Sequence, residues 1–169
     1  MTAKIVKTIK ESFPASRFIG RKYTDSDRLN GYFGAKWDEW FENNLFEKLE
    51  ALGSLPENGD AFIGAMRVKD DVFEYWIGMF LPAGTEVPSG YEYADIVPID
   101  YAVFWLYGNQ HNGELYGMDN HNMCLAEFEN HGWLQREDGW CFERYNCPRF
   151  TTPDDQGNVI LDYGIAIES

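Results

Sequence analysis

The side chains most able to do chemistry lie in residues 140–150, an aromatic run that contains one acid, Glu143. Alternate side chains of a strand share a face, so a strand here would place Cys141, Glu143 and Tyr145 on the same side. A carboxylate between a thiol and a phenol has two interpretations. Because glutamate is rarely fully buried, the commoner one is a solvated side chain on the polar face of a half-buried strand. The other is a carboxylate at the bottom of an apolar pocket.

The composition limits the partners that this carboxylate could meet. The chain has 28 acidic and 14 basic residues, for a net charge of −14, and a field of that sign repels phosphate backbones and attracts cations. We therefore expect no direct DNA binding by this chain. Aromatic residues make up 17% of the sequence, more than a plain core requires. The rings either build the core or line a ligand site.

No pattern indicates a metal, a cofactor or a membrane segment. Cys124, Cys141 and Cys147 have no metal-ligand spacing, and their odd number suits free thiols in a reducing compartment. The three histidines are ten residues apart, which puts them neither on one helical face nor at ligand spacing. The sequence has no phosphate loop, nucleophile elbow or zinc motif, no secretory leader, and no apolar run long enough to span a bilayer. We expect a soluble, cytoplasmic protein without cofactors or membrane contact.

The first half of the chain predicts one helix and three strands, the strands lying at residues 4–23, 61–68 and 72–81. The first strand is broken near Pro14, and its lysines are typical of a guarded sheet edge. The helix is bounded by capping residues from Thr24 and by a stop at Gly53, and it is continuous unless Gly31 and Gly34 break its first part.

The second half repeats this order after a connection rich in Pro and Gly at residues 82–90. Its elements are strands at 91–107, 140–145 and 159–167, the first interrupted at Pro98, and a helix from Asp119 to about Leu134. Two runs of strand, helix, strand and strand predict an α+β fold of two similar lobes, each an antiparallel sheet with a helix on one face. We predict one domain over residues 1–169, with lobe one at about 4–82 and lobe two at about 91–168.

Several segments together carry a resemblance to a known family. They are Trp37 to Phe41, Tyr75-Trp76-Ile77-Gly78, the run from Pro82 through Tyr101-Ala102-Val103-Phe104 to Gly108, Gly132-Trp133-Leu134, Phe142-Glu143-Arg144-Tyr145 and Ile165-Ala166-Ile167. In this order and spacing they resemble the gyrase-inhibitor-like (GyrI-like) small-molecule-binding domain, which is also the effector-binding domain of many AraC-type and MerR-type bacterial regulators. The resemblance covers nearly the whole chain.

The resemblance implies two lobes related by a pseudo-twofold axis, with an apolar ligand cleft between them. In such domains the acid that corresponds to Glu143 lies at the base of the cleft and faces hydrophobic, often cationic, ligands walled by rings. The resemblance therefore favours the pocket interpretation of Glu143, since a desolvated carboxylate among rings needs a partner. By their matching positions, the predicted ligand-binding residues around it are Trp37, Trp76, Tyr101, Trp105 and Tyr145, with Glu74 as a candidate second acid.

Three functions follow from this resemblance. The leading hypothesis is a stand-alone binding protein for amphipathic aromatic, cationic small molecules, because the first family strand begins almost at Met1, where regulators carry a DNA-binding domain. The second is a hydrolase that opens the strained cyclopropane ring of DNA-alkylating natural products, with Glu143 and Tyr145 as its catalytic residues and Glu74 assisting. The third is an inhibitor of DNA gyrase that acts by protein–protein contact. Sequence alone leaves open whether the chain has a protein partner or forms a homodimer.

Overall fold

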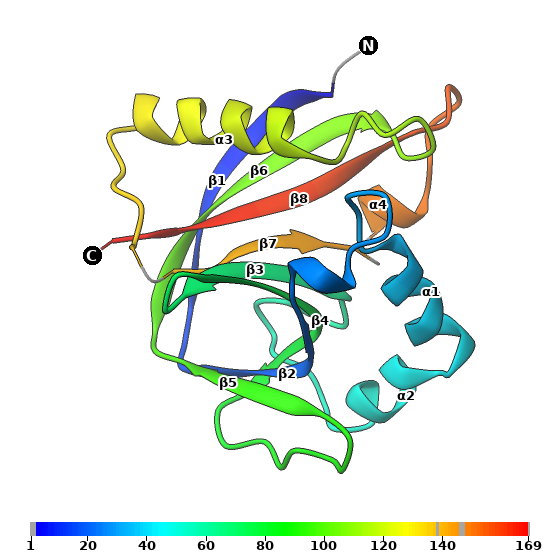
Figure 1. Ribbon diagram of the computed structural model, residues 1–169. Helices are drawn as coiled ribbons and strands as arrows, with labels where there is room; N and C mark the ends of the chain where they lie inside the picture. Colours follow the sequence, from blue (N-terminus) through cyan, green and yellow to red (C-terminus); the bar gives the residue numbers. More distant parts are fainter. Residues whose placement is uncertain (1–2, 138, 146–147, 169) are drawn as a thin grey trace.

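The computed structural model describes residues 3–137, 139–145 and 148–168, in which eight strands form one antiparallel sheet. The strand order is β1-β6-β8-β7-β3-β4-β2-β5 (Figure 1). The strands are β1 (Lys4–Phe13), β2 (Ser16–Tyr23), β3 (Ile63–Lys69), β4 (Val72–Pro82), β5 (Glu92–Ile96), β6 (Ile99–Asn109), β7 (Cys141–Arg144) and β8 (Asn158–Ile167). The helices are η1 (Asp25–Asp27), α1 (Gly34–Glu42), α2 (Leu45–Glu50), α3 (Met118–Asn130) and α4 (Pro148–Thr151). The fold is α+β, as the sequence predicted.

The strand order has an internal twofold symmetry. Reversing the order exchanges the first four strands of the chain with the last four: β1 with β5, β2 with β6, β3 with β7 and β4 with β8. The strands β3 and β7 therefore lie side by side at the centre of the sheet, where the two halves of the chain meet (Figure 1). This is the arrangement of two related lobes that the repeated order of elements predicted.

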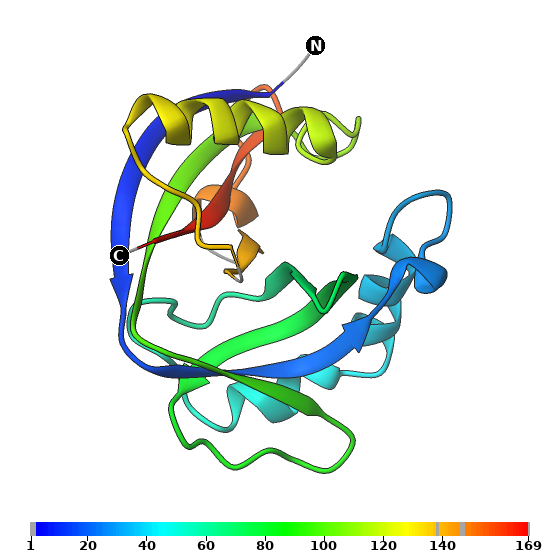
Figure 2. The same ribbon diagram turned by 60° about the vertical axis from the view of Figure 1, so that its left-hand side comes forward.

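Two long strands bend where prolines interrupt them. The gap between β1 and β2 contains Pro14, and the gap between β5 and β6 contains Pro98. Proline has no backbone N–H to donate to a neighbouring strand, so it interrupts the ladder at both places. The two bent segments pair with each other on both sides of the bend, so the sheet turns a corner and curls (Figure 2). The exposed side chains of Lys4, Lys7 and Lys10 lie on β1, which is an edge strand as predicted.

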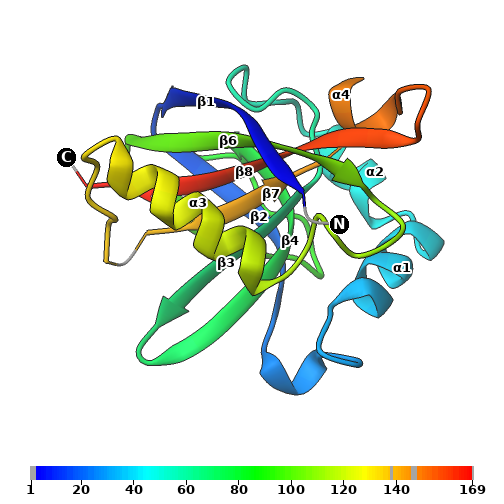
Figure 3. The same cartoon turned by 90° about the horizontal axis from the view of Figure 1, so that it is seen from above.

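The curled sheet encloses an aromatic core on one face and carries helices on the other. On the enclosed face, Phe13 of β1 packs edge-on against Phe80 of β4 at a centroid distance of 5.5 Å, although β6, β8, β7 and β3 lie between them in the sheet order. On the outer face, α3 packs over one half of the sheet and α1 and α2 over the other (Figures 1 and 3). The central strands β3 and β7 lie between these two helical layers.

The predicted helix between Thr24 and Gly53 is not continuous. The chain forms the short η1 turn, an irregular segment, and then α1 and α2 in its place. Asn30, Gly31 and Asn44 adopt left-handed φ angles of 54°, 82° and 53°, which an α-helix cannot contain. The break at Gly31 agrees with the alternative that the sequence left open. None of the helices in the described ranges is long and apolar enough to cross a membrane.

Candidate functional site

Glu143 lies on the central strand β7, on the sheet face that carries the helices. Its backbone pairs with Gly64 of β3 on one side and with Tyr163 of β8 on the other. Paired residues of antiparallel strands point to the same face, and Cys141 joins them because it is two residues from Glu143. Phe142, between the two, belongs to the enclosed core. The predicted shared face of Cys141 and Glu143 is therefore confirmed.

Four tyrosines surround the Glu143 carboxyl. Tyr145, immediately after β7, donates a hydrogen bond from its hydroxyl to Oε2 of Glu143. Tyr75 on β4, Tyr116 before α3 and Tyr163 on β8 have hydroxyl pKa values raised mainly by burial and further by the nearby Glu143 charge. For Tyr116 the pKa rises to about 12. The phenols are thus protonated at neutral pH and can act as hydrogen-bond donors.

The glycine opposite Glu143 leaves room for this ring cluster. A Cβ atom at Gly64 would lie 2.5 Å from the Tyr75 hydroxyl oxygen and 3.2 Å from Cζ2 of Trp37. Trp37 extends from α1, donates its indole N–H to the Tyr75 hydroxyl over 2.9 Å, and packs edge-on against Tyr145 at a centroid distance of 4.9 Å. The structure therefore brings together three of the predicted site residues, Trp37, Glu143 and Tyr145.

The carboxyl of Glu143 is close to its protonation midpoint at neutral pH. Burial raises the pKa of Glu143 to about 7, and the hydrogen bond from Tyr145 opposes part of that rise. No lysine, arginine or histidine within the described ranges forms an ion pair with this carboxyl. An approaching cation would stabilise the ionised form, and ring faces would add to its attraction. The same group, while protonated, could act as a general acid.

A thiol and a histidine extend the cluster toward α3. The Cys141 thiol hydrogen-bonds to Tyr163, and burial raises its pKa to about 11, so it is not a thiolate nucleophile at neutral pH. The Tyr163 hydroxyl lies 2.6 Å from Nδ1 of His121, a histidine whose pKa is lowered by burial. Cys124 and Cys141 are free and buried, as the sequence predicted, and Cys147 lies outside the described residues. His121 therefore helps to hold Tyr163 beside the carboxyl.

Four other predicted site residues point away from Glu143, into the enclosed core: Trp76, Tyr101, Trp105 and Glu74. The pairing register determines this, because Gly64 pairs with both Glu143 and Ile77, so odd-numbered residues of β4 face the site. On β6, Phe104 pairs with Tyr163, which turns Tyr101 and Trp105 inward. The prediction that these residues surround Glu143 was wrong. Matching positions along a strand does not determine which face of the sheet a side chain lies on relative to Glu143; the pairing between strands does.

These four residues have structural partners on the enclosed face. Glu74 accepts hydrogen bonds from Nε of Arg67 over 2.7 Å and from Nε1 of Trp76 over 3.0 Å. Burial would raise the pKa of Glu74, but these donors outweigh it and lower the pKa. Tyr101 is fully buried among phenylalanine rings, and Trp105 lies under a guanidinium group. Glu74 therefore forms a structural ion pair rather than a second site acid.

Sequence reasoning missed Gly64, Tyr75, Tyr116 and Tyr163. The alternation of β4 already separates Tyr75 from its neighbour Trp76, but choosing between the two faces requires the pairing with β3. Tyr163 and Gly64 become site residues only because they pair with Glu143. No local sequence signal indicates Tyr116, which lies between β6 and α3.

Comparisons with known proteins place this geometry in a known fold. No protein-family model and no curated protein matches the chain. The chain is similar to the structure of SAV2435 bound to tetraphenylphosphonium, with a TM-score of 0.69, 13% identity, and coverage of 97% of this chain and 95% of that one. It is also similar to a Staphylococcus aureus MU50 protein given a provisional role in bacterial transcription regulation, with a TM-score of 0.66, 14% identity, and coverage of 96% and 99%.

A third similar structure is EcmrR, solved in a complex with DNA. The TM-score is 0.58 at 10% identity, and the match covers 96% of this chain and 57% of EcmrR. The chain thus shares its fold with these three proteins. At the level of fold, the resemblance to effector-binding domains that the sequence indicated is confirmed.

Proposed function

We propose that this chain is a small-molecule-binding protein whose Glu143 site takes an aromatic organic cation. One observation carries the proposal: the Glu143 carboxyl has tyrosines around it, a pKa raised to about 7, and no cationic partner within the described ranges. Ionising such a carboxyl in apolar surroundings is costly unless an opposite charge accompanies it. A ligand cation would supply that charge.

Two further observations support an aromatic cation. The walls around Glu143 are rings, and a cation over a ring face gains about 0.5–2 kcal/mol. Tetraphenylphosphonium, which is bound by SAV2435, is an aromatic cation, and SAV2435 shares this fold. The net charge of −14 would also raise the local concentration of cations near the protein.

Titration with tetraphenylphosphonium tests the proposal. Tryptophan fluorescence should report saturable binding, because Trp37 packs against Tyr145 in the site. Binding to the Glu143→Gln variant should be weaker by about tenfold or more, since losing the opposing charge in a partly desolvated site costs about 1.4 kcal/mol or more.

Two controls isolate charge from shape. Tetraphenylborate has the same four rings around a negative centre, so it should not compete for the site. The Glu86→Gln variant loses an exposed carboxylate in the loop after β4 and should bind tetraphenylphosphonium as the parent does. Equal binding of the two ions, or unchanged affinity in Glu143→Gln, would show that the carboxylate does not recognise the ligand.

The raised pKa of Glu143 also favours a second candidate, acid catalysis. A carboxyl with a pKa of about 7 beside the Tyr145 hydroxyl is suited to protonating a leaving group near neutral pH. The hydrolase alternative predicts that a cyclopropane-containing alkylator is converted to a ring-opened product, and that Glu143→Gln abolishes conversion. Chromatography of the incubated compound distinguishes the two candidates, because binding alone returns it unchanged.

A further inference from the structure

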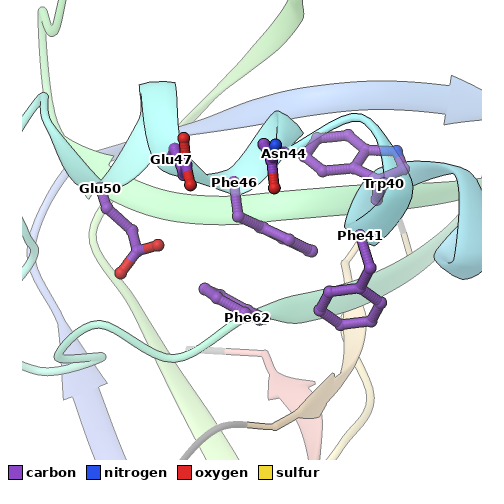
Figure 4. A pocket seen from close by; sticks show the side chains of 7 residues that line it. All are labelled: Trp40, Phe41, Asn44, Phe46, Glu47, Glu50 and Phe62. Carbon is purple, nitrogen blue, oxygen red and sulfur yellow. The ribbon is translucent and has the colours of Figure 1, made fainter.

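A ring-lined pocket lies between α1, α2 and the chain that enters β3 (Figure 4). Its volume is about 130 Å³, and its rings come from Trp40, Phe41, Phe46 and Phe62. Trp37 lies between this pocket and the Glu143 site, with ring centroids 5.8 Å from Phe46 and 4.9 Å from Tyr145. The residues that line the pocket are therefore different from those around Glu143, although Trp37 contacts both groups.

The four rings of the pocket differ in exposure: Phe41 is exposed and Phe62 half-buried, whereas Trp40 and Phe46 are buried. Phe46 and Phe62 are stacked with centroids 3.8 Å apart and planes at 6°. Phe41 lies 5.6 Å from Phe46 and 6.2 Å from Phe62, and 54% of its surface is exposed. A large ring left in water inside a concave ring cluster is typical of a binding surface rather than of a core.

Two carboxylates complete the pocket. Glu47 and Glu50 both line it and lie three residues apart on α2, which places them on one side of that helix. Figure 4 shows Glu50 on one side of the stacked Phe46 and Phe62 rings and Phe41 on the other. In the described part of the chain no ion pair involves Glu47 or Glu50. Carboxylates beside ring faces are complementary to an organic cation.

We propose that this pocket is a second binding site, for a small alkylammonium cation whose head contacts the rings of Phe41 and Phe62 and is balanced by Glu47 and Glu50. The volume sets the size of the ligand, because pockets for drug-sized molecules hold roughly 300 Å³ or more. A neutral apolar group would cover the rings but leave both carboxylates without a counter-charge. This site does not depend on the function proposed for Glu143.

Choline and 3,3-dimethylbutan-1-ol are matched probes, because they differ in having a positive nitrogen or a neutral carbon at the same place. In titrations followed by aromatic NMR, choline should shift the Phe41 and Phe62 resonances of the full chain, and the neutral alcohol should bind about fivefold more weakly or not at all. The same shifts should appear in Glu143→Gln, which keeps the two sites distinguishable.

Variants test the named contacts. The double variant Glu47→Gln, Glu50→Gln should weaken choline binding about fivefold, and Phe41→Ala should weaken it about two- to fivefold. The control Glu129→Gln removes an exposed carboxylate of α3 and should leave binding unchanged. Because all of these side chains are exposed, folding should survive each change. Equal binding of choline and the alcohol, unchanged binding in the double variant, or loss of the shifts in Glu143→Gln would overturn the proposal.

Discussion

The protein should become less stable as the pH rises from about 4.5 to about 7, because over this range the folded state keeps a proton on Glu143 that the unfolded chain has released. Burial raises the pKa of this carboxyl from 4.5 to about 7. Between these values the native state holds a proton that the unfolded chain has released, so the contribution is fully present below pH 4.5 and is lost as the pH rises through about 7. At about 1.36 kcal/mol per pKa unit, this difference corresponds to on the order of 3 kcal/mol.

Urea unfolding of the parent and of Glu143→Gln between about pH 4 and about pH 8 measures this contribution. Glutamine has nearly the same shape and does not titrate, so the other ionisable groups cancel in the difference between the two proteins. The free energy of unfolding of the parent, minus that of the variant, should fall by about 3 kcal/mol over this interval. A difference that stays constant, or that rises with pH, would refute the argument that Glu143 is desolvated.

Three further changes test the surroundings of this carboxyl. Tyr145→Phe removes the donor that opposes the rise in the pKa of Glu143, so the midpoint of the same pH-dependent loss of stability should move to higher pH. Gly64→Ala places a Cβ atom 2.5 Å from the Tyr75 hydroxyl and should cost about 1–3 kcal/mol in urea unfolding, part of which the added change Tyr75→Phe should restore. Glu74→Gln weakens a buried ion pair on the opposite face of the sheet and should lower the free energy of unfolding by about 1–3 kcal/mol. It should change the affinity for tetraphenylphosphonium by less than about twofold. A large loss of affinity would show that Glu74 belongs to the binding site.

Much of the fold is readable from the sequence because its signals are local. Pro14 and Pro98 indicate the two bends without any knowledge of which strands pair, and the repeated order of elements indicates the two halves. The predicted long helix failed for a related reason. Apolar spacing shows which residues share a face, but it continues unchanged across Asn44, whose backbone is left-handed and separates α1 from α2.

The site was only partly predictable, because the sheet face on which a side chain lies depends on pairing between strands that are far apart in the sequence. Glu143 and Tyr145 are two residues apart, so alternation alone placed them together. Tyr75 and Trp76 are adjacent, and either could have lined the site. The choice is made by the pairing of β4 with Gly64, which in turn pairs with Glu143. Such a register joins residues far apart in the chain and has no signature in one sequence.

The junction of the two halves explains why a fold with twofold symmetry carries one carboxyl site rather than two. Gly64 and Glu143 pair directly across β3 and β7, the two strands that the internal symmetry exchanges. An acid at both places would set two carboxyls about 5 Å apart across the strands, where like charges repel and one pKa rises strongly. Any side chain at Gly64 would also displace Trp37 and Tyr75. Glycine at position 64 therefore leaves the space at this junction to the Glu143 carboxyl and its surrounding rings, and under the function proposed above one monovalent cation suffices to balance its charge.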